Sequence, residues 1–286
     1  MVCKLYYVFF ASFVLSSIIS EIHVKIKANN TIEGYSKVLD KRISIEEAIC
    51  IKLVYGKNLT KWINSNIDTY VIYPYLNKDG DSSLINEDLL VQEYPLLYEY
   101  FLSLKTRLSN RGTAKMKYEY WYSHWNKRKI SRFLKRKIIT PDICLGTKMS
   151  LDSNSLAHND TAYAFIPQKD YENHIYYLLG ILNSKLVWFF LKETGNVVRG
   201  GYFRFKTKYL DPFKLPIIPN SVENEPIHNL TNNIIQLKEE NPKADTTELE
   251  QEIDVLVYQL YNLTYEEVLI VDPAFHLSKD AYEVLS

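Results

Sequence analysis

The chain has 286 residues, of which 47% are hydrophobic and 24% charged, enough for the buried core of one large domain or of a domain with a subdomain. This composition excludes a chain that is disordered throughout. The 34 basic and 34 acidic residues cancel, but residues 101–150 hold thirteen Lys and Arg against two acids, a balance of +11. Residues 221–286 hold three lysines against fourteen acids, a balance of −11. The sequence is therefore electrically polarised rather than neutral.

The cysteines and glycines exclude two kinds of site. Cys3, Cys50 and Cys144 are odd in number, far apart and without histidines at metal-binding spacing, so they indicate neither a disulfide framework nor a zinc site. We expect them to be reduced and structural. Nine glycines against 23 tyrosines count against a glycine-cradled nucleotide site and favour a surface that can stack and hydrogen-bond.

The first twenty residues are open to two interpretations. Lys4 followed by the uncharged residues 5–19 is typical of a secretory signal, and the run is too short to span a membrane comfortably. Residues 16–20 offer no clear cleavage site, and a buried element or a truncation scar explains the run as well. We expect a cytoplasmic protein, with export through this segment as the alternative.

The first half of the chain alternates predicted strands with one long helix. Residues 21–79 favour short strands, and residues 70–73 are rich in strand formers up to Pro74. A helix is predicted to begin at Pro95, with apolar residues at helical spacing as far as Leu108.

The second half continues this mixture of strands and helices. Residues 137–141 and 161–167 read as strands of one sheet, and residues 202–206 as a half-exposed strand. Residues 171–194 predict a core helix that Gly195 ends. The fold class predicted is α+β, a mixed-sheet domain with packed helices.

We expect this domain to cover residues 21–219, with residues 215–219 as its extended exit. Residues 220–246 are predicted to be a polar linker with one helical patch, and residues 247–286 an acidic helical tail. Two capping boxes support helices in the tail, one formed by Thr247 and Glu250 and the other by Thr264 and Glu267.

Catalytic motifs are missing from the sequence. It has neither a glycine loop for a methyl-donor cofactor nor a polar-Pro-Pro-aromatic tetrapeptide, because residues 211–213 (DPF) and 241–243 (NPK) hold one proline each. A nuclease reading of Asp142 fails because residues 146–148 (GTK) lack the second carboxylate that a metal ion would need. His124 is interpreted as a packed or DNA-facing residue. We expect no catalytic residue, metal site or cofactor in this chain.

Cations and aromatic residues are interleaved between residues 115 and 137, and a smaller basic cluster follows around Gly200 and Gly201. Such cations neutralise phosphates, and the aromatics can stack on bases. The alternatives are a solvated basic face and a simple hairpin turn. The candidate DNA contacts are Lys115, Lys117, Tyr120, Trp121, Tyr122, Trp125, Lys127, Arg128, Lys129, Arg132, Arg199, Arg204 and Lys206.

An ordered set of short signals runs through the chain. It consists of residues 53–59 (LVYGKNL) with Trp62, 73–75 (YPY), Tyr94-Pro95, Leu108 with Arg111, Trp121-Tyr122, 137–141 (KIITP), 177–184 (YLLGILNS), Tyr209-Leu210, 216–219 (PIIP) and 253–264. Over roughly residues 36–270, this order resembles the TaqI-like C-terminal specificity domain of adenine-N6 DNA methyltransferases and type IIG restriction-modification enzymes.

The resemblance implies a target-recognition domain for double-stranded DNA. It also implies that S-adenosylmethionine and the flipped adenine belong to a catalytic domain that we expect to be missing here. The chain would then be a subunit that docks to a separately encoded methyltransferase or endonuclease, a split remnant, or an inactive remnant. The alternative from another class is a secreted or protein-interaction domain, which rests on the apolar N-terminus and five Asn-x-Ser/Thr sites.

Overall fold

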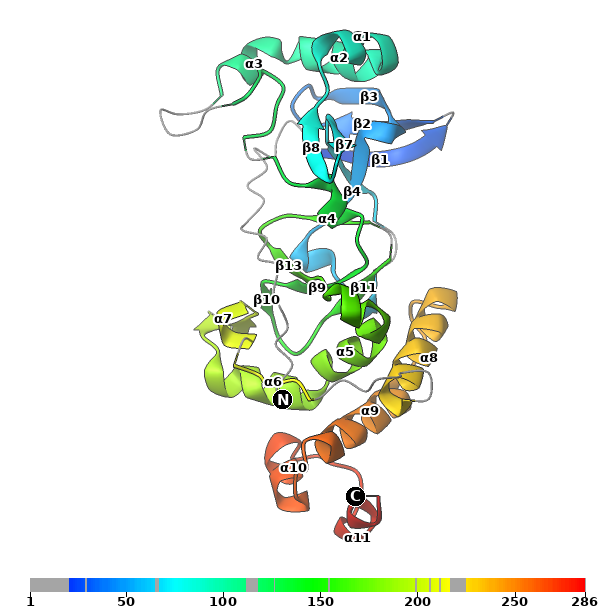
Figure 1. The fold of residues 1–286 in the computed structure, drawn as a ribbon, viewed down its shortest axis with the longest axis vertical. Helices are drawn as coiled ribbons and strands as arrows, with labels where there is room; N and C mark the ends of the chain where they lie inside the picture. The colour runs from blue at the N-terminus through cyan, green and yellow to red at the C-terminus, as the bar shows by residue number, and fades with distance from the viewer. Residues whose placement is uncertain are drawn as a thin grey trace.

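The computed structural model describes residues 21–28, 30–64, 67–111, 118–125, 127–153, 155–198, 200–205, 207–210, 212–216 and 225–285. The apolar segment 1–20 lies outside these ranges, so its two interpretations stay open. The molecule is elongated, with the helices that follow the first sheet at one end and the C-terminal helices at the other (Figure 1).

Four sheets are built from strands that are mostly antiparallel. The six-stranded sheet has the order β12 (Ala157–His158), β4 (Cys50–Val54), β6 (Thr69–Ile72), β1 (Glu21–Ala28), β2 (Thr31–Ser36) and β3 (Lys41–Glu46). The four-stranded sheet has the order β13 (Ala162–Phe165), β9 (Lys137–Pro141), β11 (Ser150–Asp152) and β5 (Trp62–Ile63). The smaller sheets are β10 (Ile143–Cys144), β15 (Tyr202–Arg204) and β14 (Val197–Val198), and the hairpin β7 (Tyr75–Lys78) with β8 (Asp81–Leu84).

Helices cover both ends of this stack of sheets. Those that precede β9 in the chain are α1 (Glu87–Glu93), α2 (Pro95–Ser103) and α3 (Lys105–Ser109) at one end, and the single turn α4 (Ile130–Phe133) in the middle of the molecule (Figure 1). Those that follow β9 are α5 (Ile175–Leu182), α6 (Lys185–Thr194), α7 (Thr207–Leu210), α8 (Pro226–Glu240), α9 (Thr247–Leu260), α10 (Tyr265–Val271) and α11 (Lys279–Val284). Short 3-10 helices are η1 (Glu47–Ile49), η2 (Gly56–Asn58) and η3 (Lys169–His174).

The predicted α+β class with a mixed sheet is confirmed. Two strand pairs are parallel, β12 with β4 and β11 with β5, and the others are antiparallel. The expected pairing of the strands at 137–141 and 161–167 is present as β9 and β13. The largest core cluster lies where α5, α6, α8 and α9 pack on the four-stranded sheet.

Two helices predicted as continuous are each broken. Pro95 begins α2 as expected, but α2 ends at Ser103 and α3 restarts after Leu104. The predicted helix 171–194 divides at Asn183 and Ser184. Asn183 uses its amide to bond both backbone groups of Met149, and Ser184 caps the next helix. Gly195 ends α6 as predicted.

In the described part of the chain, no single helix is both long and apolar enough to cross a bilayer. Residues 169–182 and 185–194 reach the required length and hydropathy only as a pair bent by 69°.

The predicted linker contains a packed helix. Helix α8 occupies Pro226–Glu240 and buries Ile227, Thr231, Ile234 and Ile235 against the protein. It lies on α5 at Gly180, where an added Cβ would stand 2.6 Å from Ile227 Cγ2 and 2.5 Å from Thr231 Oγ1. The close approach of the two helices therefore needs glycine at this position. The helical patch expected within residues 220–246 is present as α8. Its packing on the protein was not expected, because one of its four buried positions is polar and the helix is only weakly apolar as a whole.

Of the two predicted capping boxes, one is confirmed. Thr264 and Glu267 bond each other's backbone N–H groups at the start of α10. At α9 the N-cap is Thr246, and its side chain makes no capping bond to the backbone. Glu250 is engaged elsewhere, because its carboxylate accepts hydrogen bonds from Lys61, from Trp62 Nε1 at 2.8 Å and from Thr246 Oγ1 at 2.8 Å.

A buried ion pair joins β9 to β11. The side chains of Lys137 and Asp152 are 0% exposed, and their charged groups contact each other directly. Lys137 Nζ also donates to the Phe133 carbonyl at 2.8 Å, and Asp152 accepts from the Leu156 N–H at 2.9 Å. Burial lowers the pKa of Lys137, and the neighbouring carboxylate opposes this change. Both ions are thus satisfied by hydrogen bonds inside the protein.

Breaking this pair should cost much more stability than removing it completely. We expect Asp152→Ala to lower the free energy of unfolding by about 3–5 kcal/mol, because it leaves an unpaired buried ammonium. The double variant Lys137→Met/Asp152→Leu should recover most of the loss. Lys135→Ala is the matched control, since the half-exposed pair of Lys135 with Glu172 at 4.0 Å contributes less than about 1 kcal/mol. Urea unfolding measures all three, and an unchanged midpoint for Asp152→Ala would contradict the assignment.

Candidate nucleic-acid interface

The basic aromatic segment, defined here as residues 118–136, lies between α3 and β9, and among its described residues only the single turn α4 is helical. Its backbone N–H and C=O groups therefore need hydrogen-bond partners outside regular secondary structure. Two tyrosines provide them. Tyr73 OH accepts from the Arg128 N–H at 2.9 Å and donates to the Arg128 carbonyl, and Tyr75 OH accepts from the His124 N–H at 2.7 Å.

Ser82 and Arg111 complete the support of this backbone. Ser82 Oγ donates to the Arg128 carbonyl at 2.6 Å and accepts from the Ile130 N–H at 2.8 Å. The Arg111 guanidinium donates to the carbonyls of Trp121 and Ser123, and lies 4.1 Å from the centre of the Tyr118 ring. Side chains from β8 and from the end of α3 thus hold the segment in one conformation.

The aromatic residues of the segment fall into packed and surface groups. Tyr122 is buried, stacks on Phe101 at 5.7 Å between ring centres and donates its hydroxyl to the Ile85 carbonyl at 2.6 Å. The predicted contact of Tyr122 with DNA is replaced by this packing role. Trp121 is half-buried beside Lys105, and Tyr120 is exposed with its hydroxyl bonded to Glu87 at 2.6 Å.

His124 is a packed residue, the first of the two roles expected for it. Its Nε2 lies 2.9 Å from the Ile72 carbonyl, and its ring contacts the rings of Tyr73 and Tyr75. Burial lowers the pKa of His124 to about 4, so the imidazole is neutral at pH 7. It adds no positive charge to the segment.

The exposed part of the segment is strongly basic. Trp125 is 39% exposed, Lys127 and Lys129 are exposed, and Arg128 and Arg132 are half-buried. Lys135 and Arg136 extend the exposed cations toward β9. Lys137, which the sequence groups with them, belongs to the core because its charge is neutralised by Asp152.

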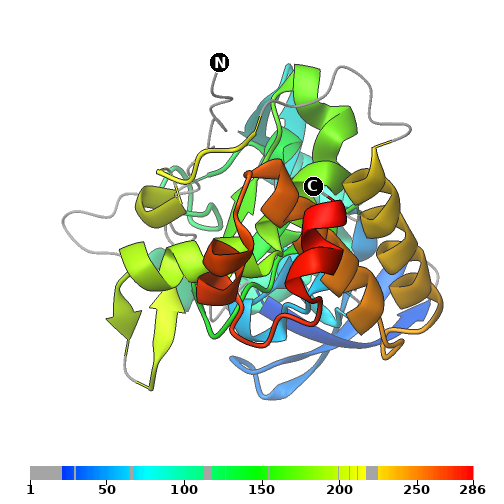
Figure 2. The same cartoon turned by 90° about the horizontal axis from the view of Figure 1, so that it is seen from below.

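The second basic cluster forms a hairpin that projects from the body of the molecule, as the yellow-green strands of Figure 2 show. Gly200 and Gly201 have φ of +86° and +79°, which glycine adopts without strain, so they suit the turn of this hairpin. Arg204 lies at the base, where its Nη1 contacts Asp142 Oδ2 at 2.9 Å. This ion pair orients the guanidinium while 36% of the side chain stays exposed.

Four predicted contacts are not placed. Lys115, Lys117, Arg199 and Lys206 lie outside the described residues. Conversely, sequence reasoning gave no role to Tyr73, Tyr75 or Arg111, which were noticed only within the family-like motifs. For the two tyrosines, the signal in the sequence is the YPY tripeptide, because a tyrosine hydroxyl next to a strand end can hydrogen-bond a neighbouring loop.

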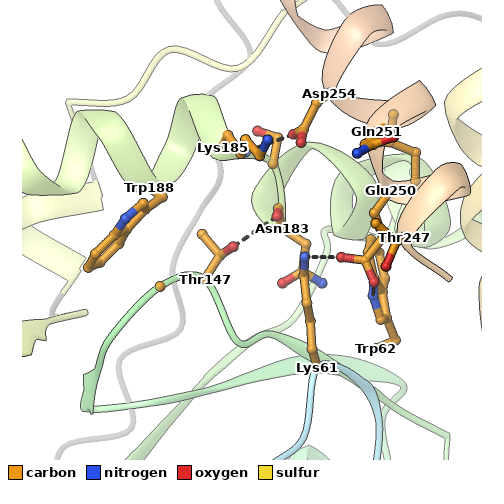
Figure 3. Close-up of a pocket in the computed structure, with 13 residues that line it drawn as sticks. Lys61, Trp62, Thr147, Asn183, Lys185, Trp188, Thr247, Glu250, Gln251 and Asp254 are labelled. Atoms are coloured by element: carbon orange, nitrogen blue, oxygen red, sulfur yellow. Dashed lines mark hydrogen bonds and ion pairs between the residues drawn. The ribbon is translucent and has the colours of Figure 1, made fainter. Parts of the chain in front are cut away.

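A separate cavity of about 330 Å³ lies between β5, the junction of α5 with α6, and α9 (Figure 3). Its polar side chains mostly bind one another. Glu250 bonds Lys61 and Trp62, and Asp254 accepts from the Lys185 N–H at 2.8 Å. Burial raises the pKa of Asp254 to about 6. The side chains that line this cavity connect α9 to the rest of the domain. They mostly bond one another and are not candidate DNA contacts.

The hydroxyl of Tyr73 should be needed to hold the segment closed. We expect Tyr73→Phe to destabilise the protein by about 1–3 kcal/mol, because it removes the hydroxyl that accepts from the Arg128 N–H, while the Arg128 carbonyl keeps its bond from Ser82. The local opening should speed trypsin cleavage after residues 127–129, measured by mass spectrometry. Tyr98→Phe is the control, because it removes only the bond of Tyr98 to Glu87. Equal cleavage of wild type and Tyr73→Phe would show that the hydroxyl is dispensable.

The chain is similar in sequence to proteins of restriction-modification systems. The type II methyltransferase M.MjaIV of Methanocaldococcus jannaschii is 28% identical over 226 residues, which are 76% of this chain and 70% of that protein. The type II restriction enzyme and methyltransferase RM.Eco57I of Escherichia coli is 26% identical over 160 residues, which are 53% of this chain and 16% of that enzyme.

A solved structure and a family model complete the comparison. The type IIL restriction-modification enzyme MmeI in complex with DNA aligns over 84% of this chain and 30% of its own, with a TM-score of 0.49 and 10% identity. The model of the TaqI-like C-terminal specificity domain matches residues 52–217. Because that match takes in more than half of the sequence, the chain belongs to the family of TaqI-like C-terminal specificity domains.

Proposed function

We propose that this chain is the DNA-recognition domain of an adenine-specific restriction-modification methyltransferase and that it binds duplex DNA through the basic aromatic segment. The observation that carries the proposal is the support of this segment by Tyr73, Tyr75 and Arg111 within the matched region. A segment with its backbone already fixed loses little conformational entropy when it binds. Its cations are therefore available at little ordering cost.

Phosphate contact is the chemistry that the segment suits best. Residues 127–136 hold six Lys and Arg and no acid, and Lys127 and Lys129 are exposed. Each phosphate that a cation neutralises releases condensed counterions from the duplex, which favours binding and makes it dependent on salt. Trp125 offers an exposed ring beside these cations for contact with a base or a sugar.

Base reading is proposed for the hairpin β14–β15. Arg204 is held by Asp142 on one nitrogen, so its remaining N–H groups can address a guanine edge in a bidentate manner. Arg199 is the other candidate reader, and Lys206 a candidate phosphate contact. Methyl transfer itself would require a catalytic domain that binds S-adenosylmethionine, which a separately encoded, cytoplasmic partner subunit could supply.

Charge reversal on the exposed face tests the proposal. We expect Lys127→Glu/Lys129→Glu to weaken binding to duplex DNA by at least about tenfold near 0.15 M salt and to reduce the salt slope by about 2. Arg128 is left intact because it is half-buried. Fluorescence anisotropy with a labelled duplex at several salt concentrations measures both quantities.

The matched control is Lys192→Glu/Lys243→Glu, which makes the same change of charge at exposed positions on α6 and after α8. It should bind nearly as wild type does. Equal binding by both double variants, or no binding by the wild type, would refute the proposed function.

A further inference from the structure

We propose that Arg136, His174 and His228 form a second phosphate site, which extends the DNA contact beyond the basic aromatic segment and tightens binding as the pH falls. This inference rests on the proposed function. It concerns three residues that are far apart in the sequence and that belong to no common sequence motif. Arg136 lies just before β9, His174 ends η3, and His228 lies in the first turn of α8.

The side chains of Arg136 and His228 meet at the ring of Tyr176 of α5. The Arg136 guanidinium lies over the Tyr176 ring, 4.5 Å from its centre, and the His228 ring packs edge-on against Tyr176 at 5.2 Å. His174 is two residues before Tyr176 at the end of η3. Arg136 is exposed, and Tyr176, His174 and His228 are half-buried. The Tyr176 ring therefore contacts Arg136 and His228, and His174 lies close enough to His228 to affect its charge.

Charges around His228 are mainly positive. Desolvation, and then Arg136 and His174, lower the pKa of His228 below its usual value. The nearby carboxylate is Glu225, which accepts the His228 N–H at 2.6 Å and has its own pKa raised by burial. Glu172 lies 4.0 Å from Lys135. The Nδ1 atom of His228 is buried and has no hydrogen-bond partner among the described residues.

A phosphodiester would suit this arrangement. It would bring a negative charge close to these basic groups, which would relieve their mutual repulsion. Binding would then raise the pKa of His228, so the complex would take up a proton. By linkage, affinity must increase as the pH falls from above the pKa of the complex toward that of the free protein.

Position supports DNA as the source of the phosphate. The exposed cations continue along the chain from Lys127 through Lys135 to Arg136, so the proposed site lies at the C-terminal end of the same run. A backbone that follows Lys127 and Lys129 needs a further contact at this end, and phosphate contacts of this kind fix the register of a protein on the duplex.

The test compares dissociation constants for one labelled duplex at pH 5.5 and pH 7.5 at constant ionic strength. Wild type should bind at least about threefold more tightly at pH 5.5, and His228→Gln should lose most of this difference. Arg136→Gln, at an exposed position, should reduce the salt slope by about 1 without unfolding the domain. Histidine NMR should show the His228 titration moving to higher pH when the duplex is added.

Two controls separate this site from other titrating groups. His276→Gln changes an exposed histidine between α10 and α11 and should keep the full pH dependence. Glu225→Gln should also keep it, because protonation of Glu225 is not the proposed cause. A pH dependence that survives in the double variant His174→Gln/His228→Gln, or one lost only in Glu225→Gln, would overturn the inference while leaving DNA binding intact. A wild type that fails to bind DNA at either pH would overturn the proposed function as well.

Discussion

The structure depends on the side-chain hydrogen bonds that hold the basic aromatic segment in place. This segment is highly charged and lacks a regular ladder of backbone hydrogen bonds. The six cationic side chains of residues 127–136 repel one another. Most described residues of the basic aromatic segment lie outside helices and strands, so their backbone groups have no regular hydrogen-bond partners. The hydroxyls of Tyr73, Tyr75 and Ser82 and the guanidinium of Arg111 make those bonds instead. Because these donors and acceptors come from rigid parts of the fold, the cost of ordering the segment is met during folding rather than on binding.

Burial sorts the charges of this region into two kinds. Lys137 lies in the core with its carboxylate partner, and His124 stays neutral among aromatic rings, so neither contributes to the external field. Lys127, Lys129 and Arg136 remain in solvent. The same stretch of sequence therefore supplies both the internal support and the outward positive surface. Counting the cations along the sequence therefore overestimates the positive charge of the surface.

Local signals predicted the elements whose causes are local. Proline at the first position of α2, the capping box of α10 and the strands β9 and β13 depend on neighbouring residues, and the sequence contains all of that information. The break after Leu182 depends on Asn183 bonding Met149, 34 residues away. Burial of Tyr122 and Lys137 similarly depends on Phe101 and Asp152. Periodicity in the sequence cannot reveal such partners, which is why these residues were grouped with the surface.

The contacts of Glu250 bear on where this module could be cut or exchanged between enzymes. Its carboxylate joins α9 to Lys61 and Trp62 of the four-stranded sheet, and α8 packs on Gly180. The apolar faces of α8 and α9 thus belong to the same core as α5 and α6. A recombinant chimera joined near residue 219 would lose α8 and α9 and expose the part of the core that they cover. A junction beyond Tyr282 would transfer the basic aromatic segment together with the helices of this core, because Val268 of α10 and Tyr282 of α11 belong to it as well.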